Sequence, residues 1–396
     1  MRLAQSIVLV VLFLAAGAAA YWLVKRGPPA PTDQPGVTAS APARLTVSGE
    51  WPCFRGGPSL PGVAQGRLGD SLKLYWRFKA PDAIRSSPVV AGGLVYVGCD
   101  DGHLFALDLG TGTEAWRFKA GDAVAAPPMV HNGVVYVGSL DGSLQALDAA
   151  SGQRKWTYKT DGAIHGSANW AESAGQLRIL VGSYDFCLHC VDAAGGERIW
   201  NYKTENYING TVSVNGDTIV FGGCDQKIHV VSLADGNEVK AIDIGQDNYV
   251  AASAALADKR AYVGTYNKKF LCVDIERGRI VWTYDGQGSF FSCPALGKDR
   301  VVVGAQDSRT HCIRRDDGRA IWTFPARGNV DSSPVICGDK VVFGSDDGRL
   351  YMVRLADGVE VWSFETGGAI SAGPAVVGGA VIVGCQDGWV YAFGPK

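Results

Sequence analysis

The sequence lacks an excess of charge of either sign. Its 37 Lys and Arg residues face 39 Asp and Glu residues, which gives a formal net charge of −2. The basic residues do not gather into a stripe along the chain. Proteins that bind nucleic acid or other polyanions usually carry such a basic surface. The composition therefore argues against a nucleic-acid partner.

The short motifs of common enzyme classes are also missing from the sequence. It has no His-Glu-x-x-His pair for a metal, no glycine-rich phosphate loop and no Gly-x-Ser-x-Gly nucleophile elbow. The six histidines are spread along the chain without the spacing of a metal site. Two cysteines form the single Cys-x-x-Cys pair, Cys187 and Cys190, which is a weak signal on its own. No catalytic residue, metal ligand or cofactor is therefore predicted from these motifs.

Long hydrophobic runs are confined to the N-terminus. Residues 7–24 carry no charge, and Lys25 and Arg26 follow them. Such a run is long enough to cross a bilayer, so we predict a transmembrane anchor over residues 1–27. The small residues at 16–20 leave a cleavable signal peptide as the alternative. Residues 28–50, rich in Pro, Ala, Thr and Ser, are predicted to be a linker. This interpretation predicts a single-pass, membrane-anchored protein with residues 51–396 on the periplasmic or extracytoplasmic side.

Glycine, in contrast, is abundant, with 52 residues that follow an internal repeat. The segment Val95-Tyr96-Val97-Gly98 recurs about every 40 residues. Its glycine stands at Gly98, Gly138, Gly182, Gly222, Gly264, Gly304, Gly344 and Gly384. Eight units of this length are typical of a β-propeller built from four-stranded blades. The predicted fold is therefore an all-β, eight-bladed propeller over residues 51–396.

Each unit carries further residues in register with this repeat glycine. Three residues later stands an aspartate, or Asn267 in one unit, which we interpret as a turn cap. In the first seven units another glycine stands fourteen residues later, suited to a turn with positive φ. A tryptophan follows in most units, and Lys240 replaces it in the fourth. These tryptophans are predicted to wedge between neighbouring blades.

The ends of the repeat array predict how the ring closes. The last unit stops at Phe393, before the strand that would carry its tryptophan. The missing strand precedes the first full unit, where Trp76 lies 40 residues before Trp116. We therefore expect the strand around Trp76 to complete the eighth blade and remove the free edges.

The ten cysteines are best explained by packing within the repeat. Cys190, Cys272 and Cys312 share one position that holds small or apolar residues in the other units. Cys53 lies outside the repeat units, and it is the cysteine that we expect to be reactive. Free thiols are uncommon in exported proteins, so this feature fits the predicted location least well.

The unit from Tyr96 to Trp116, Tyr-Val-Gly-x-x-Asp-Gly-x-Leu-x-Ala-Leu-Asp-x-x-x-Gly-x-x-x-Trp, resembles the PQQ-like propeller repeat. One branch of that family contains pyrroloquinoline quinone-dependent alcohol dehydrogenases, and another contains the non-enzymatic outer-membrane assembly factor BamB. The dehydrogenases imply a quinone in the channel, a calcium ion, an aspartate base and a disulfide between adjacent cysteines. This chain has no adjacent cysteines and no long insertions. PQQ and calcium are therefore not expected.

The resemblance favours a non-enzymatic scaffold of the BamB type that binds a protein partner in the cell envelope. The segment Trp51-Pro52-Cys53-Phe54-Arg55-Gly56-Gly57-Pro58 looks like the lead-in of many uncharacterised PQQ-like propellers, and no chemistry is attached to it. The alternative function is a PQQ-dependent or small-ligand-dependent redox enzyme that uses the central channel.

One ring of positions varies in a way that suggests binding. When the units are aligned on Pro88, the position three residues before it holds widely different side chains, whereas the next position always holds a small residue. We expect the small residues at the crowded axis and the variable ones at the channel mouth. Arg85, His165, Asn209 and Asp331 are the candidate ligand-binding residues of this mouth. The alternative is that these polar residues simply fill a hydrated funnel.

Overall fold

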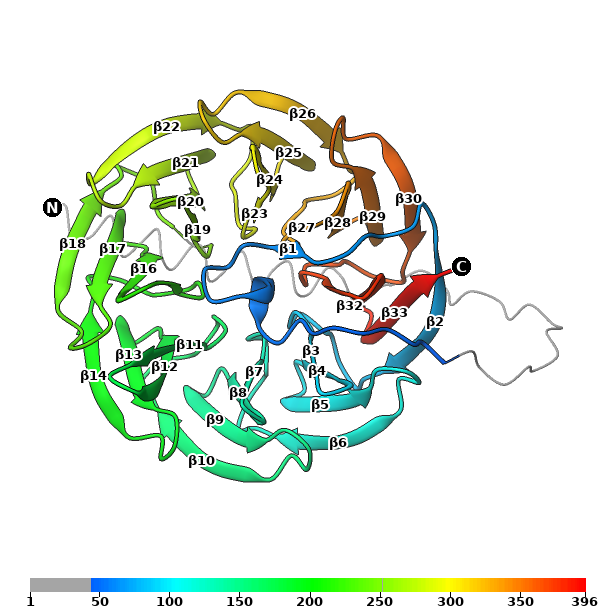
Figure 1. Ribbon diagram of the computed structural model, residues 1–396, viewed down its shortest axis with the longest axis horizontal. Coiled ribbons are helices and arrows are strands. Elements are labelled where there is room, and N and C mark those ends of the chain that lie inside the picture. Colours follow the sequence, from blue (N-terminus) through cyan, green and yellow to red (C-terminus); the bar gives the residue numbers. More distant parts are fainter. Residues whose placement is uncertain (1–43, 251) are drawn as a thin grey trace, which may run out of the picture. The chain divides into compact units, whose positions relative to one another are not determined.

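The computed structural model describes residues 44–250 and 252–396, and these form the propeller unit of the chain (Figure 1). The predicted anchor, residues 1–27, lies outside the described residues. Within the described ranges no helix has the length and apolar character needed to cross a bilayer. They are strands and turns, apart from the three-residue helix η1 (Phe54–Gly56). The described structure therefore contains no membrane-spanning helix, contrary to the architecture and the single-pass location predicted from the sequence.

The described chain forms eight sheets of four strands, and strand β1 (Val63–Ala64) is added to one of them (Figure 1). The innermost strands are β3 (Val89–Ala91), β7 (Met129–His131), β11 (Asn169–Ser173), β15 (Ser213–Asn215), β19 (Ala255–Ala257), β23 (Ala295–Leu296), β27 (Val335–Cys337) and β31 (Ala375–Val377). The second strands are β4 (Leu94–Gly98), β8 (Val134–Gly138), β12 (Gln176–Gly182), β16 (Thr218–Gly222), β20 (Arg260–Gly264), β24 (Arg300–Ala305), β28 (Lys340–Gly344) and β32 (Ala380–Gly384).

The two outer layers of the blades follow the same order around the ring. The third strands are β5 (His103–Asp108), β9 (Ser143–Asp148), β13 (Cys187–Asp192), β17 (Lys227–Ser232), β21 (Lys269–Asp274), β25 (Arg309–Arg314), β29 (Arg349–Arg354) and β33 (Trp389–Pro395). The outer strands are β6 (Glu114–Lys119), β10 (Arg154–Lys159), β14 (Arg198–Lys203), β18 (Glu238–Asp243), β22 (Arg279–Asp285), β26 (Ala320–Pro325), β30 (Glu360–Glu365) and β2 (Leu72–Lys79). The predicted eight-bladed, all-β architecture is confirmed.

The predicted closure of the ring by the strand around Trp76 is confirmed. Strand β2 pairs antiparallel with β33, so that Trp76 lies opposite Ala392. The eighth blade therefore takes its outer strand from the beginning of the propeller and its other three from the end of the chain (Figure 1). This closure gives the ring no free sheet edge at the joint between its two ends.

The repeated tryptophans join neighbouring blades through one recurring contact. Trp156 donates its indole N–H to the carbonyl of Ala193 in the next blade, at 2.9 Å. Its ring also lies against Gly196, where a Cβ atom would come within 2.6 Å of the indole. The glycine of the repeat is therefore required both by its positive φ of 74° and by the tryptophan that covers it.

Lys240 takes over part of this contact where the fourth blade lacks tryptophan. Its ammonium group donates to the carbonyl of Glu276 in the next blade. The glycine in register, Gly278, faces the aliphatic part of the lysine in place of an indole. The interblade hydrogen bond is thus kept, while the aromatic packing is lost.

The repeated aspartates act as turn caps, as expected. Asp387 accepts a hydrogen bond from the backbone N–H of Trp389 at 2.9 Å, and its other oxygen accepts one from Gly367 at 3.0 Å. Asp347 bonds to Arg349 and Arg327 in the same way. Each carboxylate therefore fixes its own turn and the connection that leads into the same blade.

Candidate functional site

The central channel is crossed at one end by the lead-in segment, residues 51–64, which precedes the first blade (Figure 1). The lead-in segment provides backbone carbonyls that accept hydrogen bonds from the innermost strands. The N–H donors are those of Val90, Val130, Val214, Leu256, Leu296 and Ile336, at 2.7 to 2.9 Å. In the third blade the side chain of Asn169 donates instead, to the carbonyl of Pro58 at 2.8 Å. One short segment thus satisfies the exposed edges of seven blades.

A buried arginine fixes the lead-in segment to the ring. Arg55 is only 2% exposed. Its guanidinium donates to the carbonyls of Pro294 and Ser333, each at 3.0 Å, and to that of Pro334. Burial lowers the pKa of Arg55. Because these acceptors belong to the sixth and seventh blades, the arginine joins the start of the chain to two distant blades.

A cavity of about 120 Å³ remains in the channel. It is lined by Phe54 of the lead-in segment and, among others, by His165, Asn209 and Phe291. The positions next to the axis are as small as expected: a Cβ atom on Gly166 would lie 2.7 Å from the carbonyl oxygen of Gly210 in the next blade. The residual space is therefore small, and two of the predicted mouth residues line it.

The structure brings two of the four predicted mouth residues together. His165 and Asn209 both line the cavity, and Tyr184 lies between them. The rings of His165 and Tyr184 have centroids 4.3 Å apart, and the hydroxyl of Tyr184 donates to the side-chain oxygen of Asn209. Burial lowers the pKa of His165, which favours its neutral form.

The other two predicted residues are bound by neighbours and do not line the cavity. Arg85 forms an ion pair with Asp100 of its own blade. Asp331 accepts a hydrogen bond from the amide of Gln306 at 3.3 Å. Burial raises the pKa of Asp331, and the hydrogen bond from Gln306 opposes this effect. The four residues therefore do not converge on a single ligand position.

The partners at the mouth belong to a second variable ring that the sequence interpretation missed. It consists of the residues two positions after each repeat glycine: Asp100, Leu140, Tyr184, Cys224, Tyr266, Gln306, Asp346 and Gln386. Asp346 is the member of this second ring whose pKa responds most clearly to its surroundings. Its pKa is raised to about 6, first by partial desolvation and then by the nearby carboxylates of Asp331 and Asp347, although the residue is still exposed to solvent. The sequence did contain a signal for this second ring, because the residue type varies at this position although the aspartate that usually follows it is nearly constant.

Aromatic side chains gather on the third to sixth blades beside this mouth. Tyr184 stacks near Tyr207 with centroids 4.6 Å apart, and Tyr266 meets Phe291 at 4.7 Å. Tyr207, Tyr249 and Tyr266 are respectively 40%, 37% and 43% exposed. The mouth thus presents accessible aromatic rings on one side and the carboxyls of Asp331 and Asp346 on another.

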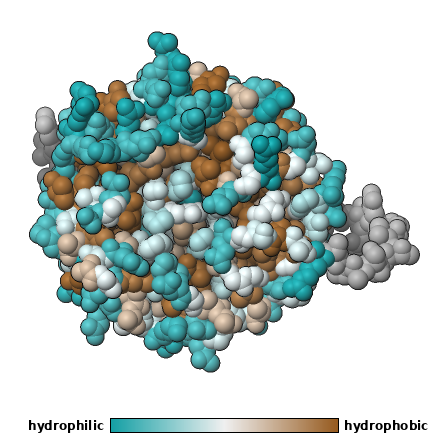
Figure 2. All heavy atoms as spheres, viewed as in Figure 1, coloured by the Kyte–Doolittle hydropathy of each residue, from teal (hydrophilic) through white to brown (hydrophobic). Residues whose placement is uncertain are grey.

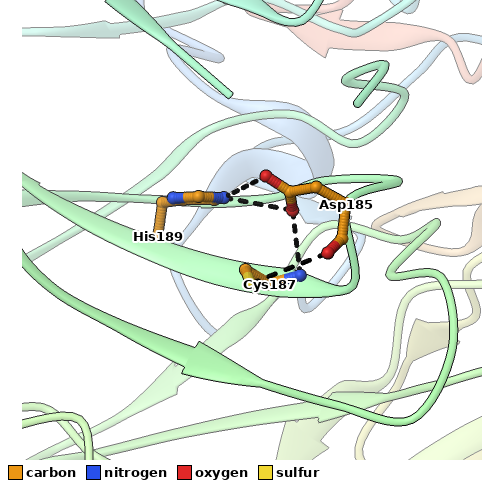
Figure 3. A group of neighbouring side chains, drawn as sticks. All are labelled: Asp185, Cys187 and His189. Atoms are coloured by element: carbon orange, nitrogen blue, oxygen red, sulfur yellow. Dashed lines mark hydrogen bonds and ion pairs between the residues drawn. The ribbon is translucent and has the colours of Figure 1, made fainter. Parts of the chain in front are cut away.

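The one group of three possible metal ligands among the described residues is Asp185, Cys187 and His189 (Figure 3). Both nitrogens of His189 are already engaged, by Asp185 at 2.9 Å and by the hydroxyl of Tyr158 at 2.9 Å. The same arrangement recurs without a cysteine in two other blades, as Tyr202–His229–Asp225 and Tyr284–His311–Asp307. The group is therefore best explained as an interblade hydrogen-bond network and not as a metal site.

This network predicts a loss of stability in mild acid. Burial, the largest effect, lowers the pKa of His189, although Asp185 acts in the opposite direction. The unfolded chain therefore binds a proton more readily, with a pKa of about 6.5. The contribution of His189 to the free energy of unfolding should therefore be fully present above pH 6.5. It should be lost as the pH falls from about 6.5 toward the lower pKa of the folded state. We expect His189→Gln to flatten this dependence in denaturant titrations between pH 8 and 5, and an unchanged slope would contradict the assignment.

The expectation that Cys53 is reactive is wrong. Cys53 is 4% exposed, and burial raises the pKa of its thiol to about 12. A buried, protonated thiol is a poor nucleophile. The cysteines of the described chain are free, and all except the partly exposed Cys224 are buried. The interpretation of the repeat cysteines as packing residues agrees with this burial.

The closed ring of eight four-stranded blades, with a tryptophan wedge and an aspartate turn in register, defines a PQQ-like β-propeller. The chain matches the family described as outer membrane protein assembly factor BamB over residues 70–177 and 225–396. This match covers more than half of the chain, so the protein belongs to that family. No curated protein matches the sequence.

Solved structures with the same fold include a BamB protein and two dehydrogenases. BamB from Moraxella catarrhalis is 19% identical with a TM-score of 0.71, covering 82% of this chain and 98% of its own. Quinohemoprotein alcohol dehydrogenase from Comamonas testosteroni is 17% identical with a TM-score of 0.76, covering 88% of this chain and 81% of its own. A europium-containing methanol dehydrogenase is 14% identical with a TM-score of 0.76, covering 88% and 98%. At these identities the likeness shows the fold alone.

The residues in the channel do not fit the cofactors of the enzyme branch. Pockets that hold organic ligands usually measure about 300–1,000 Å³, whereas this cavity measures about 120 Å³. Calcium takes six to eight oxygen ligands, usually including carboxylates, and the residues that line the cavity include no Asp or Glu. The sequence also has no adjacent cysteines. We therefore derive no chemical step through a quinone or a metal ion.

Proposed function

We propose that this protein is a non-enzymatic scaffold whose channel mouth binds a protein partner. This proposal rests on two observations together: the channel cavity is small and covered on one face by the lead-in segment (Figure 2), and exposed aromatic side chains lie around the mouth. Tyr207, Tyr249 and Tyr266 are each more than a third exposed. Tyrosine is enriched in protein interfaces and frequent among the residues that dominate their binding energy. The family description names outer membrane protein assembly, from which we extend to this chain only the binding of a protein.

The mouth suits a protein better than a small ligand. The cavity of about 120 Å³ can receive one inserted side chain from a partner, next to His165 and Asn209. The exposed rings of Tyr207 and Tyr266 flank this point and would bury apolar area against the partner's surface. The alternative redox function receives no comparable support, because neither the size nor the lining of the cavity matches a quinone.

A crosslinking experiment tests this proposal. Photoreactive amino acids at positions 207 and 266 should capture one defined partner in cells of the native source. The double variant Tyr207→Ser and Tyr266→Ser should weaken binding of that purified partner at least ten-fold, as expected for the loss of two interface tyrosines. The matched control is Val359→Ser, since Val359 is 50% exposed but precedes the outer strand β30, away from the mouth.

Two outcomes would contradict the proposal. One is an equal affinity of the double variant and the wild type for the captured partner. The other is stoichiometric uptake of pyrroloquinoline quinone and calcium by the purified protein, followed by quinone absorbance, because that result would favour the redox alternative.

A further inference from the structure

Arg315 departs from the repeat in a way that blade packing does not explain. The position eleven residues after the repeat glycine is apolar in six other blades, as Leu109, Ala149, Ala193, Leu233, Ile275 and Leu355. In the sixth blade it is Arg315, which is only 9% exposed. Burial of a charge is costly unless the charge is paired, and an apolar residue serves the fold at this position elsewhere. Departures of this kind concentrate at functional sites.

The guanidinium of Arg315 is held rigidly at the boundary of the fifth and sixth blades. It donates to the carbonyls of Gly297 and Lys298 at 3.0 and 3.2 Å, and to the hydroxyl of Tyr262 at 3.3 Å. It also lies 5.3 Å from the centroid of the Tyr262 ring. Its remaining side-chain partner is Asp258, at 2.7 Å. Because the Asp258 side chain is 82% exposed, a competing acid can reach this ion pair from solvent.

A second arginine faces the same polar hollow without a comparable partner. The hollow has a volume of about 220 Å³ and is lined by Asp258, Arg260, Tyr262, Lys298, Arg315 and Asp316. Arginines in register with Arg260 donate to backbone carbonyls 55 or 56 residues further along: Arg178 to Ala234 at 2.8 Å, and Arg300 to Leu355 at 3.0 Å. Within the described part of the chain, Arg260 makes no such hydrogen bond and no ion pair.

The charges of the hollow define what it can bind. Arg260, Lys298 and Arg315 face the carboxylates of Asp258 and Asp316, which leaves one positive charge. A guanidinium matches the two oxygens of a carboxylate, and the Asp258–Arg315 pair shows that a carboxylate meets this arginine here. We propose that the hollow between the fifth and sixth blades is a carboxylate-binding site, in which the guanidinium groups of Arg260 and Arg315 bind the carboxylate. The carboxylate belongs either to a small organic acid or to an acidic side chain of a protein.

The test is a calorimetric titration of the full chain at low ionic strength. The probes are acetate and a neutral-ended pentapeptide with one internal glutamate. We expect millimolar binding of acetate, at least ten-fold weaker in Arg260→Gln and absent in Arg315→Leu, the residue of three other blades. Asp258→Asn should tighten binding several-fold, because it removes the competing carboxylate. Arg354→Gln is the matched control, since this arginine pairs with Asp357 on another blade.

The two probes separate the sources of the carboxylate. Binding of acetate alone assigns a small acid, whereas tighter binding of the peptide assigns an acidic side chain. Absence of binding by both probes would overturn the proposal, as would an affinity that Arg260→Gln leaves unchanged or that Asp258→Asn weakens. Arg260→Gln and Asp258→Asn remove no contact of the core. These two variants therefore test the proposal even if Arg315→Leu does not fold. The result is independent of the proposed channel-mouth function.

Discussion

Replacement of Arg55 by methionine is expected to lower the free energy of unfolding by about 3–5 kcal/mol. Methionine fills a similar volume but leaves the carbonyls of Pro294, Ser333 and Pro334 without their charged donor. Loss of one side of a buried charged contact costs about this much. Equilibrium unfolding in guanidinium chloride measures the change, and Arg55→Lys should fall between methionine and wild type because a single ammonium cannot replace the guanidinium fork.

A pair of glycine variants provides the control for this arginine. Gly62 and Gly66 both have positive φ, at 64° and 89°, so alanine strains the backbone at either position. A Cβ atom on Gly62 would lie 2.0 Å from the guanidinium of Arg55, whereas one on Gly66 would meet nothing within 4 Å. Gly62→Ala should therefore be the more damaging by about 2 kcal/mol. Equal losses at the two positions would show that Arg55 does not fix the lead-in segment.

The tryptophan wedge predicts the second large effect, at Gly196. Alanine at this position adds a methyl group 2.6 Å from the indole of Trp156, in a backbone with φ of 74°. The indole must move out of the interface between the second and third blades, and with it the hydrogen bond to Ala193. We expect Gly196→Ala to lower the free energy of unfolding by about 3–4 kcal/mol, measured in the same denaturant titration.

The irregular fourth blade supplies the matched control for the wedge. Gly278 occupies the same repeat position with φ of 67°, but it faces the flexible side chain of Lys240 at 3.1 Å. Gly278→Ala should therefore cost only the backbone strain, about 1–2 kcal/mol. If Gly278→Ala destabilises the protein as much as Gly196→Ala does, the positive φ and not the tryptophan contact explains the repeated glycine.

The fold could be predicted from the sequence because the residues that define a blade recur at nearly the same spacing around the whole ring. The spacing of the glycines, the turn aspartates and the tryptophans all indicate one blade, and the missing strand at the end of the chain is matched by the strand around Trp76. The local preferences of these turn and packing residues agree with the overall fold, and a fold of this kind can be predicted from its sequence. The structure pairs this strand with the third strand of the eighth blade and places Trp76 opposite Ala392, in agreement with the predicted closure.

The candidate site was harder to predict because it depends on contacts between distant segments. His165 and Asn209 could be placed at the mouth from the repeat register, but the partners of Arg85 and Asp331 stand at a repeat position whose residue type varies from blade to blade. The role of Arg55 was not predictable, because its acceptors lie more than 230 residues away. Arg315 was visible as an exception to an apolar position, and only the structure reveals the hollow beside it.

Closure of the ring has a consequence for how the protein is made. Leu72 pairs with Pro395, so the outer strand of the eighth blade is synthesised long before its partner leaves the ribosome. The lead-in segment also lacks some of its partners until late in translation, because one of its carbonyls accepts a hydrogen bond from Ile336 in the seventh blade. During translation both segments are unpaired strands, which are the species most prone to wrong pairing. We therefore expect the last residues of the chain, 389–395, to decide whether a nascent molecule becomes a closed ring or an aggregate.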